Sequence, residues 1–511
     1  MTTFEAGDKV VGSKILSEIL VRSARDYPSR TAVISGSQRL DYGELDTRVD
    51  RFAQDLVNSK VSDRSTVAVC VSRSLEAVVA IHAAARTGAV VAPLDVKDPP
   101  ARVAAMIAGG SITHLVIERS ALKDLRSHLP AAEQETGTEE GSLVIVGIAG
   151  ADCDSPRRQS GGYLLFTSGS TGAPKGVLLS QSAVTHFTTW AMRTLSLTPD
   201  DRVAAQAALT FDLSTFDIFS TAEAGAAMVL MPDWLKPFPS DTVEWLAAQR
   251  ISVIYAVPTL LRGISEHAMA LPDLRAIAFA GEPYPARALA DLVETFPKAR
   301  IFNLYGPTET NVCTYADVSA QWCPGTPVSI GSSIDGVVTG LVNADLEFDD
   351  AEGELVVAGP TLLEGYLIDG VLVDPTVPMQ FSDGVVRRAY RTGDRAVRGE
   401  DGWLYLRGRS DAQIKRRGYR IDLAGIEAVV GALPIVRSCG AVAIEPDNEM
   451  ILFVETDDDP ASGDAIRSAL RAEFPVAHQP DHLVHLEKLP RNSRGKIDYT
   501  RLRSIATAPR Q

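Results

Sequence analysis

Cysteine is scarce in this chain and is not arranged for disulfide or zinc chemistry. Five cysteines are scattered over 511 residues, and no two of them form a C-x-x-C pair. The eight histidines also lack the spacing that is typical of metal ligands. These absences exclude disulfide-stapled and zinc-binding small domains. They favour a reduced protein, which we expect to be cytoplasmic.

Long apolar runs and an excess of positive charge are also missing. No segment reaches the ~18 consecutive apolar residues that a membrane-spanning helix needs. The first residues, MTTFEAGDKVVG, lack the basic-then-apolar layout of a signal peptide. The formal net charge is −15, which argues against a general nucleic-acid-binding protein. We therefore expect neither a membrane nor a nucleic acid among the partners.

What the chain does contain is an alternation of apolar, strand-length runs with longer helical patterns, which favours layers of helices and strands. We predict strands over 66–71 and 90–94 and helices over 75–87 and 99–107. The acidic, weakly apolar stretch 131–142 is predicted to be an exposed loop. A length of 511 residues suits one large domain plus a smaller one. The predicted fold class is therefore α/β.

The most informative segment is 164–177, which reads LLFTSGSTGAPKGV. The apolar run 163–166 predicts a buried strand that leads into a loop rich in glycine and hydroxyl groups. Glycines let backbone N–H groups approach an anion, hydroxyls donate hydrogen bonds, and a lysine supplies charge. The loop is not a Walker P-loop, because Gly176 rather than Ser or Thr follows the lysine. We predict that it cradles a polyphosphate through Thr167, Ser168, Gly169, Ser170, Thr171, Gly172 and Lys175.

This run resembles the phosphate loop of adenylate-forming enzymes, which include acyl- and aryl-CoA ligases, firefly luciferase and the adenylation domains of non-ribosomal peptide synthetases. The resemblance extends over nearly the whole chain in the family's motif order, and it follows the peptide-synthetase branch most closely. It implies a large, multi-layered N-terminal core over 1–409 and a small, mobile α+β lid domain over 410–511. Asp411, within GRSDAQIKRRGYRID, is placed at the hinge, with a turn-forming role as the alternative.

A second motif, NLYGPTE, matches the family's adenine and magnesium motif. The resemblance implies ATP and Mg²⁺ as cofactors, with Glu309 as the metal ligand, since Mg²⁺ prefers hard carboxylate oxygens. Thr308 is expected to bond the α-phosphate, and the ring of Tyr305 to pack on adenine. Asp394, in the run YRTGD, is expected to bind the ribose hydroxyls. The remaining ATP contacts implied by the family are Gly281, Glu282, Asn303, Gly306 and Arg409.

The run LPRNSRGKID near the end of the chain resembles the motif that carries the family's catalytic lysine. Lid closure is expected to bring Lys496 onto the substrate carboxylate and the α-phosphate, where it acts with Thr308 and Glu309. Attack of a carboxylate on a phosphate joins two anions, and a cation between them stabilises the transition state. Many relatives have Asn where this chain has Arg494. A non-catalytic scaffold is disfavoured because Lys496, Glu309 and Asp394 are all present.

Asp212, in the run FDLSTFD, predicts an amino acid substrate. Peptide-synthetase domains similarly place an aspartate after this Phe, where it pairs with the substrate ammonium, and a buried carboxylate needs such a partner. A helix N-cap role is the alternative for Asp212, and the competing Asp217 is expected to be structural. The side-chain pocket implied by the family is otherwise uncharged: Leu213, Phe216, Tyr255, Ala278, Ala280, Leu304, Val312 and Cys313.

This pocket favours a small neutral amino acid, because Phe216 and Tyr255 would fill much of the space. Alanine is expected first, followed by serine, glycine or a short aliphatic side chain, although one methylene discriminates by only ~1–3 kcal/mol. A β-amino acid held by the same aspartate stays open. An acyl-CoA ligase for a non-amino acid is the other alternative, against which Asp212 argues.

The second half-reaction is predicted to be aminoacyl transfer to the thiol of a phosphopantetheinyl carrier protein. No Gly-Gly-x-Ser attachment site for such an arm follows the lysine motif, so we expect a stand-alone enzyme that serves a separate carrier protein. The D-alanine–carrier protein ligases are similar in layout. In the family, the backbone around Gly418 lines the pantetheine tunnel. The neighbouring Arg416, Arg417 and Arg420 would attract an acidic carrier or form a solvated basic turn, and free coenzyme A is the alternative acceptor.

Overall fold

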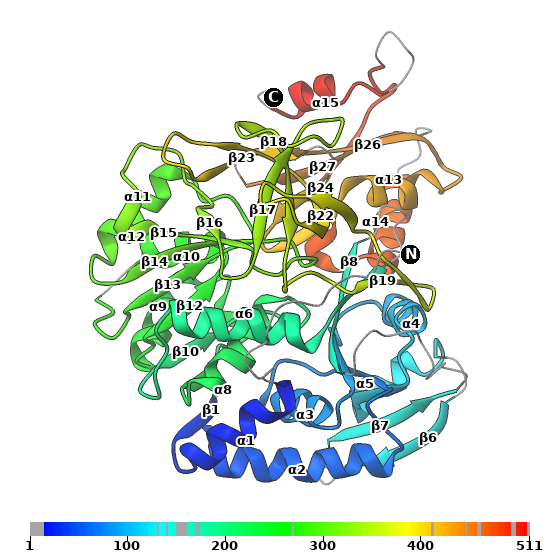
Figure 1. Ribbon diagram of the computed structural model, residues 1–511. Coiled ribbons are helices and arrows are strands. Elements are labelled where there is room, and N and C mark those ends of the chain that lie inside the picture. The colour runs from blue at the N-terminus through cyan, green and yellow to red at the C-terminus, as the bar shows by residue number, and fades with distance from the viewer. Residues whose placement is uncertain are drawn as a thin grey trace.

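Two nine-stranded sheets form the body of the N-terminal domain (Figure 1). The computed structural model describes residues 15–129, 132–138, 142–149, 161–168, 174–267, 270–409, 413–445, 447–456, 461–491 and 497–507. In the first sheet, six parallel strands are flanked by antiparallel strands at both edges. Its order is β16 (Ser332–Ser333), β15 (Thr314–Asp317), β14 (Arg300–Tyr305), β13 (Ala276–Phe279), β12 (Val253–Ala256), β10 (Arg202–Ala205), β11 (Ala227–Leu230), β1 (Thr31–Ser35) and β2 (Gln38–Asp41).

The second sheet is built around fully buried strands such as β3, whose sequence TVAVC has no polar face. Continuous apolar strands are typical of sheets that are covered on both sides. Its order is β20 (Val371–Val373), β19 (Gly365–Ile368), β9 (Pro174–Leu179), β8 (Gly162–Ser168), β4 (Val90–Leu94), β3 (Thr66–Cys70), β5 (His114–Glu118), β7 (Leu143–Ile148) and β6 (Ala132–Gly137). The strands predicted over 66–71, 90–94 and 163–166 are thus confirmed.

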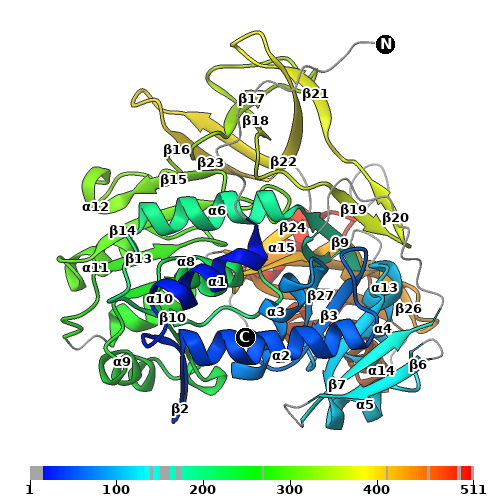
Figure 2. The same cartoon turned by 60° about the horizontal axis from the view of Figure 1, so that its bottom comes forward.

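The main hydrophobic core lies between these two sheets, and helices fill the space. They are α1 (Leu16–Asp26), α2 (Tyr42–Asn58), α3 (Leu75–Arg86) and α6 (Gln181–Thr194), and α1 and α2 come forward in Figure 2. α2 starts at a capping box between Asp41 and Glu44. The alanine-rich α3, capped by Ser74, is buried over almost its whole length because small side chains allow close packing on both sides. The predicted helix over 75–87 is confirmed.

Further helices cover the outer faces of the two sheets. α4 (Pro100–Gly109) and α5 (Arg119–Leu125) pack on the second sheet and bury Met106 and Leu122. α9 (Pro239–Ala248), α10 (Pro258–Glu266), α11 (Ala286–Thr295) and α12 (Val318–Gln321) pack on the first. A third sheet of five strands comprises β17 (Val338–Val342), β18 (Glu352–Ala358), β22 (Val386–Arg398), β21 (Val377–Gln380) and β23 (Leu404–Arg409).

The C-terminal domain is a separate small α+β unit, coloured orange to red in Figure 1. The strands β24 (Gln413–Arg416) and β25 (Tyr419–Asp422) form a hairpin. A three-stranded sheet of β26 (Val436–Ile444), β27 (Glu449–Thr456) and β28 (His482–His485) has α13 (Leu423–Gly431) and α14 (Ala461–Glu473) on one face and α15 (Tyr499–Thr507) on the other. The expected α/β class, with a large N-terminal and a small C-terminal domain, is confirmed; the boundary at residue 409 stays a prediction.

The prediction of a loop over 131–142 is wrong for part of that stretch. Residues 132–137 form β6, which pairs antiparallel with β7 at the edge of the second sheet. An edge strand is held by backbone hydrogen bonds to one neighbour, so it can form from a sequence with little apolar content. Glu135 is anchored by Arg119 and Arg126, both 3.1 Å away. In the part of the chain that the structure describes, no helix combines the length and apolar character that crossing a membrane demands.

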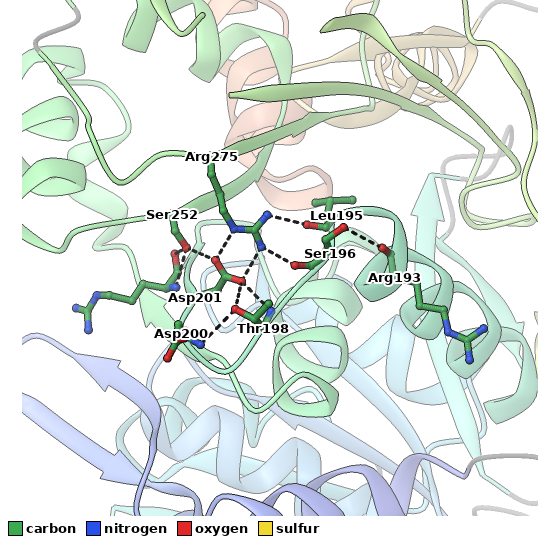
Figure 3. Close-up of polar contacts among 9 residues, drawn as sticks. Arg193, Leu195, Ser196, Thr198, Asp200, Asp201, Ser252 and Arg275 are labelled. Carbon is green, nitrogen blue, oxygen red and sulfur yellow. Dashed lines mark hydrogen bonds and ion pairs between the residues drawn. The ribbon is translucent and has the colours of Figure 1, made fainter. Parts of the chain in front are cut away.

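A buried carboxylate joins the starts of three neighbouring parallel strands in the first sheet. Asp201, just before β10, accepts hydrogen bonds from Ser252 before β12 (2.7 Å) and from Arg275 before β13 (2.8 and 2.6 Å), as Figure 3 shows. The N–H and hydroxyl of Thr198 complete its shell at 2.8 and 3.0 Å. Burial would raise the pKa of Asp201, but the hydrogen bonds from Arg275, Ser252 and Thr198 outweigh burial and lower it. The ionised carboxylate therefore ties the strands together.

Replacing Asp201 by Ala is expected to lower the free energy of unfolding by about 2–4 kcal/mol, because Arg275 and Ser252 lose a buried acceptor. The adjacent Asp200, whose side chain is 84% exposed, is the matched control. Replacing it by Ala should change the free energy of unfolding by less than ~0.5 kcal/mol. Urea titration of both variants measures the difference. Because the pKa of Asp201 is lowered, its contribution is present above about pH 5 and lost at lower pH. Equal stability of the two variants would contradict the assignment.

Candidate active site

A cavity of about 640 Å³ lies between the two domains at the carboxyl ends of the parallel strands in the first sheet. Open α/β sheets place ligands at this edge. On the N-terminal side it is bounded by the end of β8 and by the segments 210–213, 280–281 and 306–312. On the C-terminal side it is bounded by the hairpin turn 415–419 and by 475–478. Segments far apart in sequence thus meet at one site.

Asp212 is placed in this cavity at the start of a helical segment. The segment runs through α7 (Leu213–Thr215), the π-helical turn η1 (Phe216–Ser220) and α8 (Thr221–Glu223). The Asp212 Oδ1 atom accepts the N–H of Leu213 at 2.9 Å, so the capping role and a position in the cavity coexist. Burial raises the pKa of Asp212 to about 6, although the Leu213 N–H and the charge of Lys415 act in the opposite direction. A cationic ligand would favour the ionised carboxylate.

The wall next to Asp212 carries four of the predicted pocket residues on the cavity surface: Leu213, Tyr255, Ala280 and Val312. The other four lie fully buried behind that surface: Phe216, Ala278, Leu304 and Cys313. The rings of Phe216 and Tyr255 meet edge to face with centroids 5.4 Å apart. Phe216 therefore supports the wall through Tyr255, and the pocket roles of the four buried residues stay predictions.

Five residues that line the cavity have a buried polar atom with no hydrogen-bond partner among the described residues: Arg102, Thr167, Tyr255, Asn311 and His478. Two of these atoms, the hydroxyl of Tyr255 and Nδ2 of Asn311, belong to the N-terminal wall of the cavity. Burial raises the pKa of Tyr255 well above its ordinary value, and the neighbouring carboxylates Asp212 and Asp217 add to the effect. Buried polar groups are usually hydrogen-bonded. The wall thus offers polar groups that a ligand could satisfy, and nothing in the sequence around Asn311 marked it for this position.

Three of the predicted nucleotide residues make buried polar contacts. Tyr305 donates its hydroxyl to Asp394, the predicted ribose residue. Asn303 donates to the carbonyl of Ser329 at 2.7 Å. Both tyrosine and aspartate are nearly inaccessible to solvent. The Lys415 ammonium lies 5.0 Å from the centre of the Tyr305 ring, so the C-terminal domain contacts the predicted adenine platform.

Glu309 and Lys175 suit a complex of phosphates and Mg²⁺. Glu309 is fully buried and accepts the hydroxyl of Tyr366 at 2.7 Å, and the Lys175 ammonium lies 3.6 Å from the centre of that tyrosine ring. The buried hydroxyl of Thr167 has no partner among the described residues, as expected of a donor that awaits an anion. Within the described ranges no group of three potential protein ligands surrounds a metal position. Mg²⁺ commonly takes one or two carboxylates and completes its shell with phosphates and water, so these residues fit it.

Several predicted site residues lie outside the described residues. They are Gly169, Ser170, Thr171 and Gly172 of the phosphate loop, the predicted hinge Asp411 and the predicted catalytic Lys496; the side chains of Ser168 and Arg409 are also not described. The residues that flank the lysine segment, Arg491 and Ile497, pair with each other. Ile497 packs against the hydrophobic cluster beneath α15. Among the described residues of 480–491 and 497–507, none lines the cavity.

The C-terminal domain instead presents the hairpin turn around Gly418 to the cavity. The Gly418 N–H donates to Oε1 of Glu282 at 3.0 Å, and Oε2 of Glu282 accepts the Thr259 hydroxyl at 2.7 Å. Gly418 has φ of +85°, and a Cβ at this position would come within 3.0 Å of a Val257 methyl group. Glycine is therefore required both by the backbone conformation and by the close approach. Glu282, predicted near the adenine edge, contacts the other domain, a role that its sequence context did not reveal.

The chain was compared with protein-family models, curated proteins and solved structures. Residues 20–367 match the model described as AMP-binding enzyme. An L-proline--[L-prolyl-carrier protein] ligase of Pseudomonas fluorescens is 32% identical, over 95% of this chain and 98% of the relative. The crystal structure of IdnL1 aligns with a TM-score of 0.78 at 26% identity, covering 93% of this chain and 98% of that one.

A third comparison supports the fold alone. The Vibrio cholerae adenylation domain AlmE, solved in complex with glycyl-adenosine-5'-phosphate, has a TM-score of 0.81 at 22% identity and covers 99% of this chain and 100% of its own. The agreement extends over both domains. Together with the family match, which covers more than half of the chain, it shows that this protein belongs to the AMP-binding enzyme family.

Proposed function

We propose that this protein is a ligase that activates an amino acid with ATP and then transfers the aminoacyl group to the thiol of a separate carrier protein. The observation that carries the proposal is the position of Asp212, a carboxylate in the cavity wall whose pKa burial raises to about 6 against the opposing charge of Lys415. The ammonium group of an amino acid would supply a further positive charge. The relatives named as L-proline--[L-prolyl-carrier protein] ligases, at 32% identity, support the same chemistry.

In the first half-reaction, an oxygen of the substrate carboxylate attacks the α-phosphorus of ATP, and the bond to pyrophosphate breaks. Thr167 and Lys175 would bind the phosphates, Thr308 the α-phosphate, and Asp394 the ribose. Glu309 would hold Mg²⁺, which screens phosphate charge when it is bound. We propose that Lys496 reaches the two reacting anions after the domain spanning 410–511 reorients. A cation placed there stabilises charge that develops in the transition state.

In the second half-reaction, a thiol that has lost its proton attacks the acyl carbon, and AMP leaves. The turn around Gly418 forms part of the cavity wall and is held to the N-terminal domain by Glu282. This arrangement supports a role of the turn in forming the path along which a phosphopantetheine arm reaches the acyl adenylate. The relatives' named acceptors are carrier proteins, and free coenzyme A is the alternative acceptor.

For the amino acid itself we propose a small neutral side chain. The alanine-first expectation treated Tyr255 as apolar filling, but its unpartnered hydroxyl favours serine over alanine, since a bound hydroxyl would satisfy it. L-Proline, named for the relatives, meets the requirement for a cation at Asp212 and leaves Tyr255 unsatisfied. A β-amino acid held by the same carboxylate is the remaining candidate.

Amino-acid-dependent ATP–pyrophosphate exchange tests the reaction directly. A panel of L-, D- and β-amino acids is compared with the corresponding acids that lack the amine, and exchange is expected only with the amino acids. Asp212→Asn should lower kcat/KM by ~100-fold or more, because the ammonium loses its only full counter-charge. Asp217→Asn is the matched control, because Asp217 is a second buried carboxyl of the same segment and does not line the cavity.

Exchange in Asp217→Asn should stay within about threefold of wild type, as is usual for a group outside the reaction. Exchange that depends only on acids without an amine would contradict the proposal and indicate an acyl-CoA ligase. Equal losses in the two variants would show that Asp212 acts through the fold rather than through the substrate.

Tyr255→Phe tests the side-chain preference. Removing the hydroxyl should lower kcat/KM for serine by about 10–100-fold and leave the value for alanine within about threefold, since only serine brings a partner for it. Pyrophosphate exchange with both amino acids gives the ratio. An equal fall in kcat/KM for both amino acids would mean that Tyr255 shapes the cavity wall without contacting the substrate side chain.

A further inference from the structure

Exposed apolar side chains from both domains lie on segments that line the cavity. Val476, at the start of η3 (Val476–His478), lines the cavity and yet is 85% exposed, so it lies where the cavity opens. In the N-terminal domain, Lys236 and Pro237 line the same cavity. In the sequence they stand between Trp234 in η2 (Asp233–Leu235), which is 62% exposed, and Phe238, which is 54% exposed.

Two large exposed aromatic residues, Trp234 and Phe238, on one short segment are unusual for a surface without a partner. Single exposed apolar residues are common, but grouped large ones mark interaction sites. Tryptophan is also enriched among the residues that contribute most to binding energy at protein interfaces. The three exposed residues come from both domains, and Val476 is more than 200 positions from the other two in the sequence. Their relative positions therefore depend on how the two domains are oriented. We call Trp234, Phe238 and Val476 the apolar rim.

Next to the apolar rim, three cations surround a single carboxylate. Asp233 is contacted by Arg73 at 2.5 Å, Lys97 at 2.9 Å and Lys236 at 3.2 Å. Burial opposes ionisation of Asp233, but Arg73 and the two lysines prevail and lower its pKa to about 2. The charge of Arg73 also reaches Asp217, a buried carboxyl whose pKa burial raises well above its ordinary value.

This part of the cavity therefore offers hydrogen-bond donors from two ammonium groups. Lys97 and Lys236 both line the cavity, and each ammonium has three donors, of which Asp233 takes one from each. The other carboxylates that line this side are Asp95 and Asp98. Asp98 lies 4.0 Å from Arg102, and burial raises its pKa to about 6, so near neutral pH it is largely ionised and faces that guanidinium. An anion at the opening would meet two lysines with spare donors.

We propose that the apolar rim and the lysines Lys97 and Lys236 form the docking surface for the phosphopantetheine-bearing carrier protein. This inference rests on the proposed function. An arm that reaches toward Asp212 must leave the cavity at this mouth, and its phosphate joins the arm to the carrier at that point. The phosphate is an anion that matches the two lysines, and the carrier's apolar surface covers Trp234, Phe238 and Val476.

Loading assays with several thiol acceptors test the surface. Wild-type protein is offered a panel of purified peptidyl carrier proteins with their phosphopantetheine arm attached, and in parallel free phosphopantetheine and free pantetheine. Trp234→Ala and Phe238→Ala should each raise the KM for the carrier protein by about tenfold or more. Both variants should leave amino-acid-dependent pyrophosphate exchange and transfer to pantetheine unchanged. Val57→Asp is the control, since Val57 is 50% exposed on α2, at the bottom of Figure 1 and far from the C-terminal domain.

The lysines are tested by the preference between the two free thiols, which differ only in the phosphate. Wild-type protein should use phosphopantetheine several-fold better than pantetheine, and the preference should fall toward one in Lys97→Ala and Lys236→Ala because the phosphate loses its donors. An unaltered preference in both variants would overturn the phosphate assignment.

Other outcomes of these assays would overturn either the docking proposal or the proposed function. Equal losses with carrier protein and pantetheine would place the effect of the apolar rim on the fold rather than on docking, and so overturn the proposal. Transfer to pantetheine or coenzyme A without loading of any carrier in the panel would do the same. A wild-type dimer that becomes a monomer in Trp234→Ala would assign the apolar rim to self-association instead. Absence of pyrophosphate exchange in the wild type would count against the proposed function itself, which the docking variants do not touch.

Discussion

A carboxylate in a largely apolar wall is the constraint around which this site is organised. Asp212 is fixed by the N–H of Leu213 at the start of a helical segment that passes through a π-helical turn, a form common at functional sites. Ionising that carboxylate in place is costly, and its pKa rises to about 6. The energetic demand is met when a ligand brings a positive charge. In the proposed function, the ammonium group of an amino acid would meet this demand.

The arrangement of the domains decides which chemistry the site can support. In this structure the turn around Gly418 closes the cavity, while the described flanks of the predicted lysine segment pack beneath α15. A hydrogen bond from the Gly418 N–H to Glu282 joins the turn to a loop that also forms part of the cavity wall. The rings of Tyr419 and Phe211 also meet, with their centroids 4.6 Å apart. This geometry supports acceptor transfer more directly than adenylation. The same C-terminal domain supplies Lys415 to the predicted adenine platform, so its position affects both halves of the reaction.

Much of the fold could be predicted because the determining signals are local. A local apolar pattern predicts each of three elements: the strand before the phosphate loop, the alanine-rich α3 and the strand β4. The edge strand β6 was not predicted, because the backbone of its neighbour stabilises it rather than its own side chains. Its sequence therefore carries no apolar pattern that would indicate a strand. Its acidic residues, such as Glu135, find arginine partners from α5 and the turn after it.

The site was predictable where a motif is contiguous, and less so where distant segments converge. Asp212 and Tyr255 lie on the cavity surface as their motifs suggested, whereas Phe216 lies behind Tyr255, a depth that spacing along the chain does not encode. The cluster of Arg73, Lys97 and Lys236 around Asp233 could not be inferred, because its members come from three separate segments that meet only through the sheet crossovers. Asn311 was missed because an unpartnered amide is visible only in three dimensions.

The most direct test of the central claim is the pH dependence of the amino acid KM in pyrophosphate exchange, measured between pH 5 and pH 8. The substrate ammonium binds the ionised form of Asp212, whose pKa in the free protein is about 6. The KM should therefore be nearly constant above pH 7 and should rise by about tenfold for each unit below pH 6, because binding must then displace a proton. The same profile in Asp212→Asn should be flat in this range. A wild-type KM that does not depend on pH, or an equal dependence in the variant, would contradict the account.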